Sequence, residues 1–248
     1  MIKFRKIISL TVLSVICLPF LVAMFHPMQR AAISQQTKAV LPSVPRNGLL
    51  GEWLFTVNAA DTSGNGNNGS FVGDAAVTGG VLVLDGAGDW VTVGTIARGT
   101  GDFSWSMWVK TSASGGALFG QSGWPYGAYN IRIDSGHIGL GQITDTATAA
   151  WDPVNGTETF NNNSWRLVTF TRTGGAYKSY VDTTADINTT GKPAGNIDGG
   201  GAWPLKIGGC TTNTNYAFTG SMARVRFYDR VLTIDDVTAI YNAEIGEF

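Results

Sequence analysis

Hydrophobic and polar residues alternate along much of the chain with a period of two, which is typical of β-strands. The clearest example is 103–110, FSWSMWVK, in which Phe103, Trp105 and Val109 share one face. Trp108 lies on the opposite face, so both faces carry a large aromatic side chain. We therefore expect this segment to be an inner strand of a β-sandwich, with Trp108 covered by a second layer or a closed groove.

Similar short runs, separated by turns rich in Gly, Asn, Asp and Ser, predict further strands. The predicted strands are 49–55, 81–84, 90–93, 103–110, 117–121, 129–134, 137–142, 165–172, 176–182, 205–207 and 223–229. Residues 143–163 form a long polar segment in which we expect no strand. Thr233 and Asp236 form a Thr-x-x-Asp capping box ahead of an apolar stripe, which predicts one helix. These elements predict an all-β jelly-roll β-sandwich of two antiparallel sheets with one short C-terminal helix.

The N-terminal segment has a different pattern and predicts a hydrophobic leader. A short basic stretch precedes an uncharged apolar run over residues 7–25, which is the order found in secretion signals. The run is also long enough to span a bilayer. We predict that residues 1–32 are a signal peptide or a signal anchor and that 33–47 form a Pro/Gln/Ser-rich spacer. Both outcomes place 48–248 outside the cytoplasm, secreted or anchored at the cell surface.

Composition fits a globular body that does not bind nucleic acid. The 248 residues are 44% hydrophobic and 14% charged, which is enough apolar content for a sizeable core. Residues 1–32 hold four of the 17 basic groups and none of the 18 acidic ones, so the remainder has 13 basic against 18 acidic groups, or −5. Such a balance gives no footprint for nucleic acid. Cys210 is the only cysteine after the leader, which excludes an intramolecular disulfide there.

The order of the segments resembles the laminin-G-like domains of the concanavalin A-like lectin/glucanase superfamily. The matching stretches are GLLGEWLF (48–55), DTSGNGNNG (61–69), LVLDGAGDWVTV (82–93), FSWSMWVK (103–110), WRLVTFTRTGGAYKSYVD (165–182), LKIGG (205–209) and FTGSMARVRFYDRVLTIDDVTAIYN (218–242). The resemblance covers nearly all of 48–248 and implies a concanavalin A-like sandwich. Function sits in sites built onto a fold, so the resemblance alone assigns no activity.

The sequence favours a non-catalytic protein. Retaining glycoside hydrolysis needs two carboxylates about 5–5.5 Å apart, and the Glu-x-Asp-x-x-Glu pattern of the glucanases is absent. The glutamates of the body are Glu52, Glu158, Glu244 and Glu247. None has another acid two or four residues away on a predicted strand. His137 has no nucleophile motif around it. A polysaccharide hydrolase or lyase assembled from distant carboxylates is kept as an alternative.

Calcium is the candidate cofactor. The loop DTSGNGNNG supplies oxygen ligands at Asp61, Asn65 and Asn67, the type that Ca²⁺ prefers. The resemblance implies a further Asp from a late Gly-x-x-Asp segment, where this chain has Ala223. The alternative is a structural Asn/Gly turn.

Aromatic residues outside the predicted core strands are the candidate ligand-binding residues. They are Trp124, Tyr126 and Tyr129 in the segment QSGWPYGAYN, together with Trp151 and Trp203. Aromatic rings pack against the apolar faces of sugars, and binding residues concentrate on loops. The alternative is that these rings close the open ends of the core.

Together these features predict an extracytoplasmic recognition module that binds a glycan or a surface glycoprotein, with calcium as its candidate cofactor. A structural or protein-adhesion domain that contacts another surface protein is the first alternative, and a polysaccharide-degrading enzyme is the second. The membrane is expected to be contacted only through the leader, if the leader is uncleaved.

Overall fold

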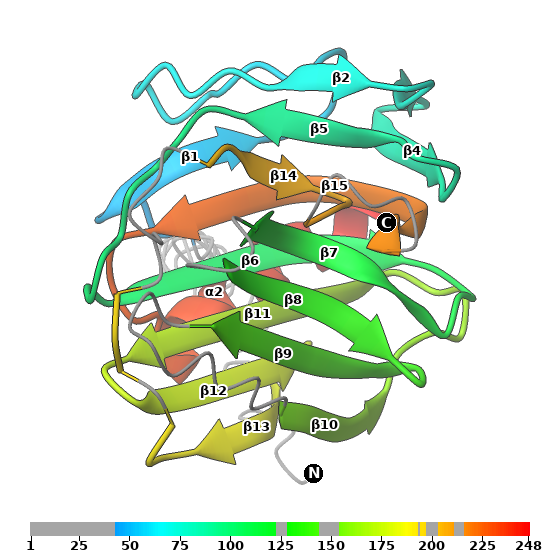
Figure 1. The fold of residues 1–248 in the computed structure, drawn as a ribbon. Helices are drawn as coiled ribbons and strands as arrows, with labels where there is room; N and C mark the ends of the chain where they lie inside the picture. Colours follow the sequence, from blue (N-terminus) through cyan, green and yellow to red (C-terminus); the bar gives the residue numbers. More distant parts are fainter. Residues whose placement is uncertain (1–42, 123–127, 144–153, 193, 197–202, 211–215) are drawn as a thin grey trace, which may run out of the picture. The chain divides into compact units, whose positions relative to one another are not determined.

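Two antiparallel sheets pack face to face and enclose the core (Figure 1). The computed structural model describes residues 43–122, 128–143, 154–192, 194–196, 203–210 and 216–248. Within them the predicted all-β jelly-roll sandwich is confirmed. Among the described residues, no helix combines the length and the apolar content that a bilayer crossing needs. Residues 1–42 lie outside this set, so the leader and most of the spacer stay predictions.

The first sheet has eight strands in the described residues, in the order β13-β12-β11-β6-β15-β4-β3, and β1 also pairs with β15. Its strands are β1 (Leu49–Trp53), β3 (Ala76–Thr78), β4 (Val81–Asp85), β6 (Phe103–Lys110), β11 (Arg166–Thr173), β12 (Ala176–Val181), β13 (Thr184–Thr189) and β15 (Thr219–Tyr228). The predicted central strand is β6, which lies between β11 and β15. Its alternation is confirmed, because Phe103, Trp105, Met107 and Val109 all point into the core.

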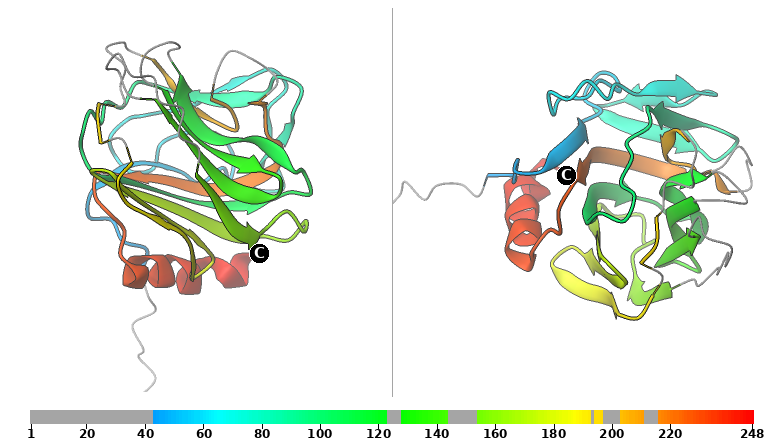
Figure 2. Two further views of the ribbon diagram at one scale, coloured as in Figure 1. Left: turned by 60° about the horizontal axis from the view of Figure 1, so that its bottom comes forward. Right: turned by 60° about the vertical axis from the view of Figure 1, so that its left-hand side comes forward.

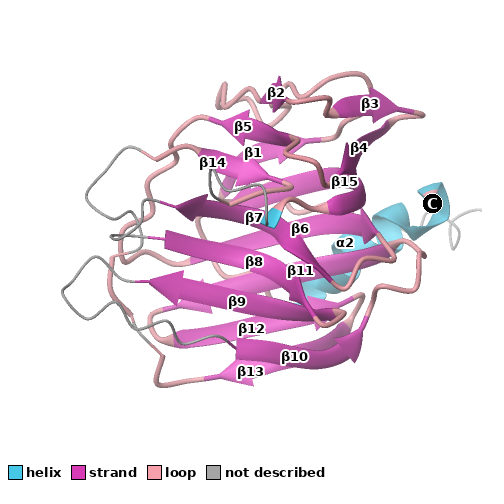
Figure 3. Cartoon of the chain, turned by 45° about the vertical axis from the view of Figure 1, so that its right-hand side comes forward, coloured by secondary structure: helices cyan, strands magenta, loops and turns pink. Residues whose placement is uncertain are grey.

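The second sheet has seven strands in the order β10-β9-β8-β7-β14-β5-β2, and Figure 3 shows it in front of the first. Its strands are β2 (Ser70–Val72), β5 (Trp90–Val93), β7 (Gly115–Ser122), β8 (Ala128–Asp134), β9 (His137–Ile143), β10 (Val154–Thr159) and β14 (Leu205–Ile207). Apolar residues of both sheets alternate inward, and they form one continuous cluster between the layers.

Strand β10 lies in the polar segment 143–163, where no strand was expected. Its sequence is polar and lacks a buried apolar face, so period-two alternation of hydrophobicity gives no signal. The strand is held instead by Asp186 of β13, whose carboxylate accepts backbone N–H groups from Thr157 and Glu158 at 2.6 and 2.9 Å. Gly156 permits this approach, because a side chain there would collide with Asp186. The contact ties the edges of the two sheets together.

Helix α2 (Ile234–Glu244), followed by the short 3₁₀ helix η2 (Ile245–Glu247), covers the outer face of the eight-stranded sheet (Figure 2). The predicted capping box is confirmed. Thr233 Oγ1 accepts from Asp236 N at 3.2 Å, and the Asp236 carboxylate accepts from Thr233 N at 2.8 Å. Val237 and Ile240 are fully buried beneath the helix. Trp108 belongs to the same outer cluster, as its position on β6 predicted.

A buried ion network fixes the helix to the sheet. Arg226 on β15 donates from Nε to Glu52 Oε1 at 2.8 Å and from Nη2 to Glu244 Oε1 at 2.6 Å. All three side chains are no more than 5% exposed. Trp108 Nε1 donates to Glu244 Oε2 at 2.8 Å. Burial acts to raise the pKa of Glu52, but hydrogen bonds from Arg226 and Thr62 outweigh it and lower that pKa. The network joins β1, β6, β15 and α2.

We expect Glu244→Ala to lower the free energy of unfolding by about 3–5 kcal/mol, because Arg226 would lose a buried partner and the Trp108 indole would lose its acceptor. Urea unfolding followed by tryptophan fluorescence measures this loss. Glu247→Ala is the matched control, since the Glu247 side chain is 62% exposed, and it should cost less than about 1 kcal/mol. Equal losses in the two variants would contradict the structural role assigned to the network.

Asp236 should make the helix start sensitive to acid. Hydrogen bonds from Arg230, at 2.7 and 3.0 Å, lower the pKa of Asp236 although burial opposes them. A carboxylate whose native pKa is lowered stabilises the fold above its unfolded pKa of about 4, and the contribution is lost as the pH falls below that value. Asp236→Asn should therefore cost about 1 kcal/mol at pH 7 and clearly less at pH 3. Urea unfolding at both pH values tests this, and a pH-independent difference would refute it.

Candidate functional site

A one-residue bulge in β15 places an arginine at an unusual position on the outer face of the eight-stranded sheet. β15 has two residues between Ala223 and Arg226, whereas β6 has one between their partners. Arg224 lies in this bulge with φ of 51°, in the left-handed region that few non-glycine residues adopt. Bulges re-aim side chains and are frequent beside functional sites.

Arg224 is held by residues at the end of the helix. Its guanidinium lies 3.4 Å from a carboxylate oxygen of Glu244 and 3.4 Å from one of Glu247. Its Cζ is 5.2 Å from the ring centroid of Phe248, within the range of a cation–π contact. The helix end therefore orients the arginine along the sheet surface instead of outward into solvent.

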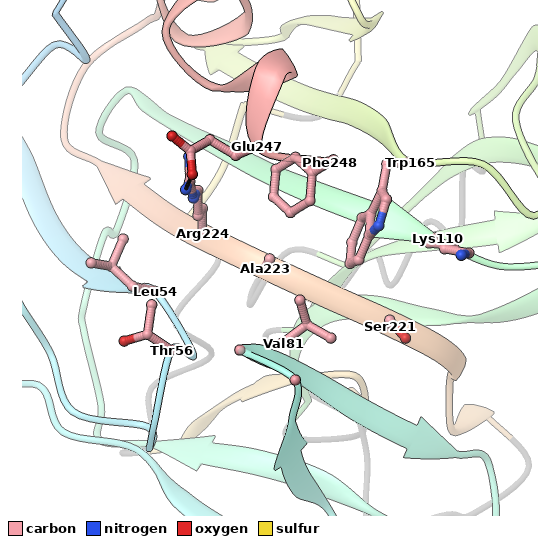
Figure 4. Close-up of a pocket in the computed structure, with 12 residues that line it drawn as sticks. Leu54, Thr56, Val81, Lys110, Trp165, Ser221, Ala223, Arg224, Glu247 and Phe248 are labelled. Atoms are coloured by element: carbon pink, nitrogen blue, oxygen red, sulfur yellow. Dashed lines mark ion pairs between the residues drawn. The ribbon is translucent and has the colours of Figure 1, made fainter.

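Aromatic rings lie next to Arg224 on the same outer face of the sheet. The ring centroid of Phe248 lies 4.6 Å from that of Trp165 and 4.8 Å from that of Trp108. Trp108 is fully buried, Trp165 is half-buried and Phe248 is 37% exposed. Figure 4 shows Phe248 between Arg224 and Trp165, with Lys110 beyond Trp165. Trp165 and Phe248 thus leave ring surface available to a ligand.

These side chains surround a pocket of about 480 Å³, a volume within the usual range for small-molecule sites. The lining residues are Leu54, Thr56, Gly79, Gly80, Val81, Lys110, Trp165, Ser221, Ala223, Arg224, Glu247 and Phe248. Apolar side chains and two aromatic rings share the lining with two cations, one carboxylate and two hydroxyls. Such a mixture suits a small polar molecule that has an apolar face.

The floor of the pocket contains the position at which the resemblance implied an aspartate. Ala223 is 1% exposed and is paired with Trp108 across the sheet. Its methyl group leaves the floor small and apolar. Alanine, in place of the aspartate that the resemblance implied, therefore leaves room beneath the two aromatic rings.

Of the aromatic residues predicted to bind a ligand, the two that the structure describes, Tyr129 and Trp203, do not line this pocket. Tyr129 is 2% exposed, and its ring packs in the core against Phe103 and Phe119. Trp203 is 42% exposed and precedes β14. Trp124, Tyr126 and Trp151 lie outside the described residues, so their part in ligand binding stays a prediction.

The loop predicted to hold calcium is internally hydrogen-bonded. The Asp61 carboxylate accepts backbone N–H groups from Glu52, Ser63 and Asn67 at 2.8–3.0 Å. Asn65 and Asn67 donate their amide groups to the carbonyl of Leu50, and Asn65 also donates to that of Leu49. These bonds explain the Asn/Gly composition of the loop as a structural turn. Calcium at Asp61, Asn65 and Asn67 stays a prediction.

Three aspartates gather near the turn between β4 and β5, two from that turn and one from the β2–β3 connection. Carboxylate oxygens of Asp74, Asp85 and Asp89 come within 4.8 Å of one another. Asp89 is buried, and its two oxygens accept from the backbone N–H groups of Asp85 and Gly86. Burial, together with the charge of Asp85, raises the pKa of Asp89. The hydrogen bonds account for Asp89 as the residue that builds the turn.

The residues that form the pocket were missed because each one resembled a structural residue in the sequence. Trp165 was predicted as the first residue of the strand 165–172, but it precedes β11 and is half-buried. One feature of the sequence could have revealed the bulge. In β15 the residues that point into the core between the sheets are Met222, Val225 and Phe227, which are spaced by three and then by two. A strict strand has spacing two, so the interval of three marks the bulge.

This two-sheet fold defines a concanavalin A-like sandwich, and the family model agrees. Residues 85–238 match the model of the concanavalin A-like lectin/glucanases superfamily. The chain belongs to this family, as a laminin-G-like domain. A search of curated proteins finds no significant match.

Several solved structures share the fold. Domain 4 of an extracellular GH43 arabinanase from Geobacillus stearothermophilus, in complex with arabinotriose, has a TM-score of 0.62 and 17% identity over 78% of this chain and 98% of that one. The binding domain of Paraclostridial Mosquitocidal Protein 1 has a TM-score of 0.60 and 16% identity over 80% of this chain and 52% of that one.

The ligand binding domain of botulinum neurotoxin serotype D, in complex with N-acetylneuraminic acid, has a TM-score of 0.57 and 15% identity over 81% of this chain and 52% of that one. This chain thus spans about half the length of the toxin domains and nearly all of the arabinanase domain. At these identities the likeness shows the fold. These structural neighbours are binding domains, and two of them hold a carbohydrate.

We expect Asp61→Ala to lower the free energy of unfolding by about 2 kcal/mol, because three buried or half-buried N–H groups would lose their acceptor. The loss in EDTA measures this structural role by itself, and urea unfolding is repeated in millimolar calcium for comparison. A loss seen only when calcium is present would instead assign the loop to a cation.

Proposed function

We propose that this protein is an extracytoplasmic, non-catalytic carbohydrate-binding module, and that the glycan binds in the pocket beneath the end of α2. The observation that carries the proposal is the pair of ring surfaces on Trp165 and Phe248, placed within one cavity that also contains cations and hydroxyls. A pyranose has an apolar face that packs on such rings and hydroxyls that bond to such groups. Membership of a lectin-like family supports this proposal.

Binding without cleavage is supported by the charges of the pocket. Glu247 is the single carboxylate among its lining residues, and it is paired with Arg224. Retaining hydrolysis needs a second carboxylate about 5–5.5 Å away, and inversion needs one about 6.5–9.5 Å away. The predicted leader supports an extracytoplasmic location, where polysaccharides and surface glycoproteins are found.

Trp165→Ala should weaken retention on the best glycan by about tenfold, because a stacking surface is lost. A glycan array and pull-down on insoluble polysaccharides identify that glycan, and titration calorimetry then compares the variants. Tyr216→Ala is the matched control, since Tyr216 is 47% exposed and does not line the pocket. Reducing-end assays should show no release of sugar.

Trp203→Ala provides the competing test. If Trp203→Ala abolished binding and Trp165→Ala did not, the pocket proposal would be wrong and the site would lie near β14. If no glycan were retained with or without calcium, the carbohydrate proposal itself would be refuted.

A further inference from the structure

The positive charges of the pocket are not equally available to a ligand. Arg224 is already compensated by Glu244 and Glu247. Lys110, in contrast, has no ion pair or side-chain hydrogen bond to any residue in the described part of the chain. It is half-buried at the end of β6. An unpaired ammonium that is partly removed from water attracts an anion more strongly than an exposed one does.

Lys110 lies next to the aromatic wall. It pairs with Ser221 across β6 and β15, and Trp165 lies one residue beyond the Arg166–Val109 pair on the other side. A hydroxyl, an ammonium and an indole therefore follow one another along one line of the sheet, and Figure 4 shows Trp165 between Phe248 and Lys110. A sugar ring that packs on Trp165 would present a ring substituent to Lys110.

The opposite end of the pocket has a different charge. Glu247 lies there beside Arg224, and its carboxylate is 62% exposed. A second anionic group on the ligand would find no uncompensated cation at this end, because Arg224 is already paired, whereas neutral hydroxyls would find donors and acceptors in Arg224, Glu247 and Thr56. The pocket is thus asymmetric, with one end suited to an anion and the other to hydroxyls.

We propose that the pocket selects a pyranose that carries one carboxylate, as in a hexuronic acid or a sialic acid, with the carboxylate on Lys110 and the ring on Trp165 and Phe248. This inference rests on the proposed function and adds a ligand class to it. It disfavours densely sulfated chains, because their second charge would meet the paired Arg224 and Glu247 instead of a free cation.

Matched pairs of ligands, measured on the full-length protein, test the proposal. The probes are a glucuronic acid-terminated oligosaccharide against its glucose-terminated counterpart, and sialyllactose against lactose. At least one acidic member should bind about tenfold more tightly than its neutral partner, and the pair that shows the preference identifies the source of the carboxylate. Raising the salt from low to high concentration should reduce this preference.

Lys110→Gln should remove the preference for the acidic ligand, so that the acidic and neutral members of a pair bind equally, because Gln keeps most of the side-chain length without the charge. Lys178→Gln is the matched control, since Lys178 is an exposed lysine on β12 that does not line the pocket. Thermal unfolding of each variant confirms that the fold is retained. Lys110→Glu, which reverses the charge, should favour the neutral ligand.

The outcomes separate this inference from the proposed function. Equal binding of acidic and neutral ligands, both weakened by Trp165→Ala, would overturn the acidic preference and leave glycan binding in place. An acidic preference that survives Lys110→Gln would also overturn it, as would tighter binding of a sulfated chain. Failure of every glycan to bind would refute the proposed function first.

Discussion

The outer layer of this protein depends on one buried guanidinium. Arg226 is 3% exposed and has carboxylates from β1 and α2 on either side. A buried charge is tolerated only when its partners are in place, because the cost of removing it from water is otherwise large. The helix position is therefore set by Glu244 as well as by apolar contacts. The residues after α2, including Phe248, follow from that position, so the ion network helps to place the pocket wall.

The bulge in β15 gives the same strand two different arginines. Arg226 lies beneath the helix and is buried, whereas Arg224, two residues earlier, is displaced by the inserted residue and lines the pocket. Both side chains lie on the outer face and contact Glu244, at 3.4 Å from Arg224 and 2.6 Å from Arg226. The extra residue sets Arg224 apart from the buried network, so Arg226 holds the helix while Arg224 lines the cavity. The small side chain of Ala223, just before Arg224, leaves the floor open.

The elements with strong local patterns could be predicted from the sequence, whereas the elements that depend on tertiary contacts could not. Alternation predicted β6 with a large aromatic side chain on each face, and the capping box predicted the start of α2. Strand β10 was missed because a carboxylate from β13, and not its own pattern, holds it. The pocket was missed for a similar reason: Lys110, Trp165 and Phe248 are far apart in the chain, and no local pattern reports that α2 folds back over β6. Spacing in β15 was the one local sign.

The position of β15 in the chain has a consequence for synthesis. This strand is the last one in the described chain, yet it pairs with β1, β4 and β6 at the middle of its sheet. Leu49, near the start of the body, is paired with Tyr228. Pairings of such long sequence separation form slowly. A nascent chain therefore holds β6 with one edge unsatisfied until almost the whole body has left the ribosome, which is the state that a translocation channel or a chaperone would need to receive.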